Sequence, residues 1–72
     1  MNAVSPGRYR HYKGNEYEVI AIARHSETEE KLVVYRKLYD DGSFWVRPLA
    51  MFVETVPVDG VMVPRFAWVG AI

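Results

Sequence analysis

The chain has 72 residues, with nine Lys and Arg, nine Asp and Glu, and no cysteine. Half of the residues are hydrophobic, and five tyrosines, three phenylalanines and two tryptophans are among them, so the composition excludes intrinsic disorder as the main state and the length excludes a two-domain enzyme. The lack of cysteine excludes disulfides and thiolate metal sites, and the zero net charge argues against nonspecific nucleic-acid binding.

Turn chemistry divides the chain into short segments. Gly14-Asn15, Asp41-Gly42 and Asp59-Gly60 each accept positive φ at low cost, and each lies between runs rich in β-branched and aromatic residues. They predict three hairpin turns between strands at residues 7–12, 16–24, 32–39, 44–47, 56–58 and 61–68. Pro57 and Pro64 have no N–H to donate to a ladder, so we expect them at edges or strand ends.

Helix signals are few. Ser26 and Glu29 have capping-box spacing, but the β-branched run that follows favours a strand, so we expect a polar loop there. Pro48 suits a first helical position, and Leu49 would share a face with Phe52. The sequence therefore predicts one helical turn after Pro48 that plugs an end of the sheet.

The two central strands are apolar on both faces. In residues 18–24, Ile20 and Ile22 alternate with Val19, Ala21 and Ala23, and residues 32–39 show the same pattern. A sheet with one solvated face alternates apolar with polar residues instead. We therefore expect a strongly curled barrel, a partner subunit or a ligand to cover the second face.

A family resemblance follows from several strings, which read YRHYKG from Tyr9, HSET from His25, LVVYR from Leu32, WVRP from Trp45 and VPRF from Val63. Over residues 7–66 the chain resembles a bacterial family of short proteins known only as domain of unknown function sixteen fifty-three. The resemblance implies an SH3-like β barrel and transfers no functional residue. The apolar tail at residues 67–72 departs from the expected pattern.

The fold class that we predict is all-β. It is a small SH3-like partly open barrel of five or six short strands with one helical turn after Pro48, forming a single domain over residues 1–72 with residues 1–6 flexible.

Most candidate chemistry has a simpler structural explanation. His11 and His25 are the only histidines, and neither has the spacing of a metal site, so we expect no metal and no cofactor. The carboxylate pairs Glu29-Glu30 and Asp40-Asp41 are typical of solvated turns. The five glycines stand at separate turns and form no phosphate-binding loop.

Basic residues interleaved with aromatics are the one pattern that points to a site. Such a surface stacks bases, grips a peptide or holds a carboxylate. We predict a noncatalytic binding or assembly module with an aromatic and arginine-lined groove. Its candidate ligand-binding residues are Arg10, Tyr12, His25, Tyr35, Arg36, Trp45 and Arg47.

Two alternatives stay open. One is a small enzyme or enzyme subunit that uses His25 with Glu27 or Glu29, and a histidine and carboxylate converging in a pocket would favour it. The other is single-strand nucleic-acid binding, which requires one face to gather Arg8, Arg10, Lys13, Arg36, Lys37 and Arg47.

The apolar central strands and tail also predict partners. A chain of this length has little to cover them with, so we expect a homodimer and a protein or peptide partner. The sequence has no run long enough to span a membrane and no signal-peptide pattern, so we expect a cytoplasmic protein.

Overall fold

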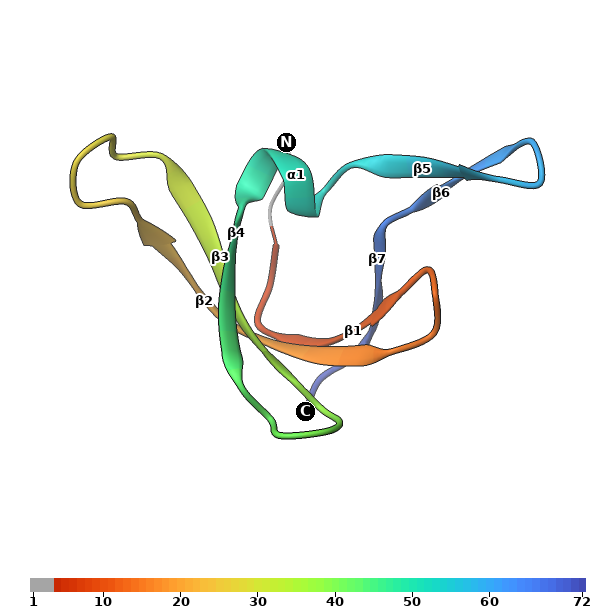
Figure 1. Ribbon diagram of the computed structural model, residues 1–72, viewed down its shortest axis with the longest axis horizontal. Coiled ribbons are helices and arrows are strands. Elements are labelled where there is room, and N and C mark those ends of the chain that lie inside the picture. Colours follow the sequence, from red (N-terminus) through yellow and green to blue (C-terminus); the bar gives the residue numbers. More distant parts are fainter. Residues whose placement is uncertain (1–3) are drawn as a thin grey trace.

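The computed structural model describes residues 4–72, which form seven strands and one helical turn (Figure 1). In chain order the elements are β1 (Gly7–His11), β2 (Glu16–Arg24), β3 (Lys31–Lys37), β4 (Phe44–Pro48), α1 (Leu49–Phe52), β5 (Thr55–Val58), β6 (Val61–Pro64) and β7 (Phe66–Gly70). The expected all-β fold is confirmed. It has seven strands rather than five or six.

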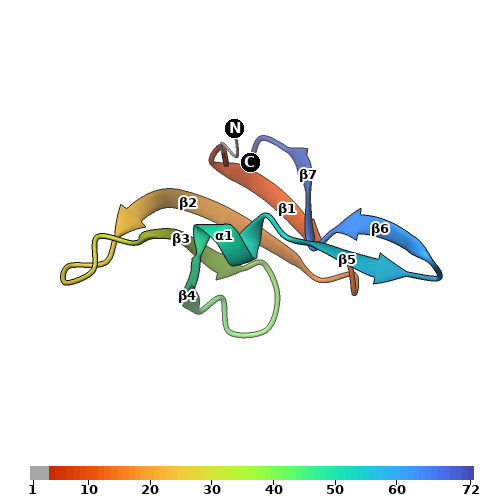
Figure 2. The ribbon, with the colours of Figure 1, turned by 90° about the horizontal axis from the view of Figure 1, so that it is seen from above.

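Five strands form one antiparallel sheet in the order β4-β3-β2-β1-β7, and β5 and β6 form a separate two-stranded ribbon. The sheet curls on itself, but its edge strands β4 and β7 do not pair with each other, so the barrel stays partly open. The β2–β3 and β5–β6 hairpins project from opposite ends (Figures 1 and 2), which gives extents of 39 × 27 × 19 Å.

All three predicted hairpin turns are present. Gly42 has φ of 65° between β3 and β4, and Asp59 and Gly60 have φ of 50° and 80° between β5 and β6. Two consecutive residues with positive φ match the twist of the strands that they join. The Ser26 region is a loop between β2 and β3, also as expected.

The helical turn after Pro48 is confirmed as well. Pro48 has φ of −51° and immediately precedes α1. Phe52 at the end of α1 is 1% exposed, and Leu49 packs against the same cluster of buried side chains. This core consists mostly of rings, and its buried members are Tyr9, Val19, Val33, Tyr35, Phe52 and Phe66.

The strand expected over residues 61–68 is in fact two strands in different sheets. Pro64 ends β6. The backbone of the next residue, Arg65, forms hydrogen bonds to two different segments: its N–H donates to the Glu54 carbonyl, just before β5, at 2.9 Å, and its carbonyl accepts from the Tyr12 N–H, just after β1, at 2.9 Å. The chain thus changes partner from β5 to β1 at this one residue.

The apolar second face of the central strands is partly exposed. A bulge lies between Val19 and Ala21, so the residues on either side of it keep their pairing with β3 in shifted register. Ile20, at the bulge, is 39% exposed, and Ile22, which pairs with the buried Val33 and so lies on the core-facing side, is still 40% exposed. The curvature of the sheet therefore does not bury all the apolar side chains of the central strands.

The expected flexible segment at residues 1–6 lies partly outside the described residues. Val4 packs against the core, and the Ser5 carbonyl accepts a hydrogen bond from the Tyr9 hydroxyl at 2.9 Å. Within residues 4–72, no helix is long and apolar enough to cross a membrane.

A β-branched residue at position 42 should destabilise the chain, because the left-handed φ of Gly42 is strained for such a side chain. Gly42→Val should lower the free energy of unfolding by about 1–3 kcal/mol in denaturant titrations. Gly42→Asn is the matched control and should cost much less, since asparagine tolerates this region. Equal stability of Gly42→Val and the parent chain would contradict the turn geometry.

The homodimer stays a prediction, and the fold offers two places for it. Phe44 and Val46 are exposed on edge strand β4, and Trp68 and Ile72 are exposed near the C-terminal end. Light scattering should give a dimeric mass. Its loss in Phe44→Glu would place the contact at β4, and its loss on truncation after Gly70 would place it at the C-terminal end. A monomeric mass for the parent chain would contradict the dimer.

Candidate functional site

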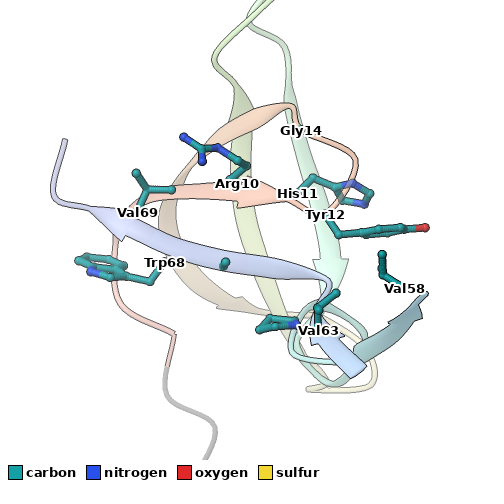
Figure 3. A pocket seen from close by; sticks show the side chains of 10 residues that line it. Arg10, His11, Tyr12, Gly14, Val58, Val63, Trp68 and Val69 are labelled. Atoms are coloured by element: carbon teal, nitrogen blue, oxygen red, sulfur yellow. The ribbon is translucent and has the colours of Figure 1, made fainter. Parts of the chain in front are cut away.

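A groove of about 580 Å³ lies where three parts of the chain meet. The β1–β2 corner contributes Arg10, His11, Tyr12 and Gly14, and β7 contributes Ala67, Trp68 and Val69. The β5–β6 hairpin supplies Val58, Val63 and Pro64. Figure 3 shows the Tyr12 ring beside Val58 at one end and Arg10 beside Val69 toward the other.

Basic side chains lie in and beside the groove: Arg10 lines it, and Arg8 and Lys13 are next to lining residues. The Arg10 guanidinium donates to the Glu16 carboxylate from Nε at 2.9 Å and from Nη2 at 2.6 Å, and Arg8 lies 3.6 Å from the same carboxylate. The Lys13 ammonium lies 5.8 Å from the centroid of the Tyr12 ring. Two arginines thus share one glutamate, and no carboxylate lines the groove.

A second hollow of about 320 Å³ adjoins the first, with Pro64, Ala67 and Trp68 lining both. It opens beside the core residues Tyr9, Phe52 and Phe66. Tyr9 meets Trp68 edge to face, with ring centroids 5.5 Å apart. Trp68 is therefore held by the core on one side and remains 53% exposed.

Two of the seven candidate residues line the groove, namely Arg10 and Tyr12. Tyr35 is 6% exposed and belongs to the core. Trp45 lies on β4, away from the groove, where its indole N–H donates to the Ser43 hydroxyl at 2.8 Å. The Lys37 ammonium lies 5.4 Å from the Trp45 ring.

The remaining three candidates have separate surroundings. Arg36 donates to Glu18 at 2.7 Å, and the Arg47 guanidinium lies 5.5 Å from the centroid of the Phe66 ring. The Nδ1 of His25 accepts from the backbone N–H of Glu27 at 3.1 Å, within its own exposed loop. None of them lines the groove.

Strand register also separates the basic residues. Arg36 pairs with Glu18 across β3 and β2, whereas Lys37 pairs with Tyr17, so these two side chains lie on opposite faces of the sheet. Arg47 pairs with the buried Val33 and shares the core-facing side with Lys37. The six cations named for nucleic-acid binding therefore do not gather on one face.

Sequence reasoning missed the apolar half of the groove. Val58, Val63 and Val69 line it because the chain turns at Arg65 and folds the β5–β6 hairpin beside β7. The signal available was Pro64, which has no N–H for a continued ladder. Among residues 4–72, no three His, Asp or Glu side chains are placed to hold a metal ion.

Tyr17 and His11, both next to the core residue Phe66, have shifted pKa values. Burial raises the pKa of Tyr17 to about 12, and its 2.8 Å hydrogen bond to the Tyr39 hydroxyl acts in the same direction. Burial also lowers the pKa of His11, and the positive charges of Arg47, Arg65 and Lys13 lower it further.

Comparison with known proteins places the chain in a family. A family model described as a protein of unknown function, DUF1653, matches residues 7–68. The chain belongs to the DUF1653 family. A crystal structure of a protein of this family from Bordetella bronchiseptica is 42% identical to it, with a TM-score of 0.89, and the match covers 100% of this chain and 95% of that one. No curated protein matches the chain.

The DUF1653 chain should lose stability at high pH through Tyr17. The folded state holds the proton of Tyr17 up to about pH 12, whereas the unfolded chain releases it near pH ~10. The free energy of unfolding should therefore fall as the pH rises from about 10 toward 12. Denaturant titrations should show a smaller fall for Tyr17→Phe, and Tyr12→Phe, which removes an exposed hydroxyl, is the control. Identical pH profiles for Tyr17→Phe and the parent chain would contradict this assignment.

Proposed function

We propose that the chain is a noncatalytic binding module that takes an extended peptide segment into the groove beside β7. The observation that carries this proposal is the position of the groove along an edge strand. β7 pairs with β1 on one side only among residues 4–72, so its other edge has backbone groups free for a further strand. Addition of a strand to an exposed sheet edge is a common mode of peptide recognition.

The lining favours apolar side chains on that peptide. The groove volume of about 580 Å³ lies within the range of small-ligand sites. Tyr12 and Trp68 provide flat rings at its surface, both partly exposed. Such rings contribute large contact areas at low entropic cost and often dominate binding energy.

The charge at the edge of the groove, where Arg10 lines it and Arg8 lies beside Arg10, adds a second requirement. Arg8 and Arg10 together carry one more positive charge than the single glutamate between them. An acidic side chain on the peptide would complement this surplus, because complementary charges fix orientation and speed association. The ligand we propose is thus an extended segment with apolar residues and one acidic residue.

The enzyme alternative receives less support. His25 is exposed, accepts two backbone N–H groups of its own loop and lines neither hollow. Glu29 is 3.4 Å from Arg24. The SH3-like assignment remains part of our proposal, as does a cytoplasmic location.

The test is selection of peptides from a random display library on the full chain. We expect enriched peptides to combine apolar and acidic residues, and Tyr12→Ala to weaken their binding by at least about tenfold, which is the order of a hot-spot truncation. Trp45→Ala is the matched control, since it removes a similarly exposed ring outside the groove.

Two results would overturn the proposal. One is a library that yields no enriched sequence. The other is a set of peptides whose affinity falls with Trp45→Ala and stays unchanged with Tyr12→Ala, because their binding surface would then be β4 rather than the groove.

A further inference from the structure

A second set of polar groups gathers around the Phe66 ring, on the inner side of the curled sheet. The His11 ring lies 4.9 Å and the Tyr17 ring 5.6 Å from the Phe66 ring, centroid to centroid, and the Arg47 guanidinium lies 5.5 Å from the same centroid. These side chains come from β1, β2 and β4, so only the folded sheet brings them together. We propose that Arg47 and His11 form a binding site for a small oxyanion, either a carboxylate or a phosphate.

Arg47 differs from every other arginine of residues 4–72 in its lack of a partner. Arg8 and Arg10 pair with Glu16, and the other three pairs are Arg24 with Glu29, Arg36 with Glu18 and Arg65 with Glu54. The Arg47 side chain forms no ion pair or hydrogen bond within the described residues. A half-buried guanidinium therefore keeps five N–H donors available in a fork that suits a carboxylate or phosphate.

His11 supplies a second donor. Its Nδ1 accepts the backbone N–H of Lys13 at 3.1 Å. A neutral ring that accepts at Nδ1 carries its proton on Nε2, where it is available to an anion. The neighbouring Tyr17 and Tyr39 share one hydrogen bond of 2.8 Å, which leaves one of their two hydroxyl protons unused.

The charges around His11 favour an anion. The charged groups near enough to lower its pKa are Arg47 from β4, Arg65 between β6 and β7, and Lys13 in the β1–β2 turn. The Glu54 carboxylate lies 3.2 Å from Arg65 and the Asp40 carboxylate lies 3.7 Å from Lys37, so both are already paired. Arg47 is left uncompensated, and charge-assisted hydrogen bonds to an anion would be strong in this partly buried setting.

This site is separate from peptide binding in the groove, although His11 also lines the groove. An anion bound beside His11 would stabilise its protonated form and raise its pKa. Binding should therefore tighten as the pH falls through the His11 titration. His25, exposed in the β2–β3 loop, is the internal control for that titration.

The experiment follows the ring signals of both histidines by nuclear magnetic resonance while the full chain is titrated with sodium phosphate or with sodium acetate. Sodium chloride at the same ionic strength is the reference. We expect saturable shifts and a raised pKa for His11 alone. The effective salt identifies the oxyanion: response to phosphate alone indicates a tetrahedral anion, and response to acetate indicates a carboxylate.

Arg47→Gln should weaken binding at least about tenfold, the order of a lost hydrogen bond between charged groups. Lys31→Gln is the matched control, because it removes one positive charge from an exposed position at the start of β3. Arg47→Lys keeps the positive charge but lacks the paired N–H donors of the guanidinium, so this variant should bind the oxyanion with intermediate affinity.

The proposal fails if the parent chain responds to phosphate and acetate no more than to chloride, a result that needs no variant to fold. It also fails if folded Arg47→Gln saturates as the parent chain does. Neither result bears on the selected peptides, so the two sites are tested independently.

Discussion

The parallel stack of Phe52 on Phe66 is the contact on which the barrel depends. The ring centroids are 4.2 Å apart and the planes differ by 3°. Phe52 ends α1, which follows edge strand β4, and Phe66 begins β7, which is the other edge strand. Because no backbone hydrogen-bond ladder joins β4 to β7, packing of these aromatic rings holds the two edges of the sheet together. Tyr9 and Tyr35 meet the same stack from β1 and β3.

The groove is a consequence of the same closure. Phe66 is held in the core, and the preceding residue must leave the β5–β6 ribbon to reach it. Arg65 makes this change with one backbone bond to Glu54 and one to Tyr12, and its guanidinium lies 3.2 Å from the Glu54 carboxylate. The base of the hairpin is thereby fixed beside β7. An apolar ribbon held at an angle to an edge strand leaves a hollow between them.

Local chemistry was sufficient to predict the turns, the helical turn and most strand bounds, because each depends on neighbouring residues. Gly42, Asp59 and Gly60 have the positive φ that their types favour. The break at Arg65 was not predictable from Val, Met and Phe propensities, since it depends on where Phe66 packs. Tyr35 was predicted at a surface, yet strand parity places it with Val33 in the core. Both alternating sets of residues in these strands are apolar, so the sequence pattern does not show which set faces the core.

The face of the sheet on which an arginine lies also determines whether it finds a carboxylate partner. Arg36 and Arg47 both stand in strands rich in apolar residues, and neither type nor neighbours distinguishes them. Arg36 faces outward, where Glu18 on the adjacent strand meets it. Arg47 faces inward, opposite Val33, where the side chains in reach are rings. The balanced net charge of the whole chain thus conceals a local imbalance. Five arginines have a carboxylate partner where they stand, with Arg8 and Arg10 sharing Glu16. Arg47 is the arginine of residues 4–72 without one, and it lies on the inner side of the sheet near His11, whose pKa is lowered by burial and by this positive charge.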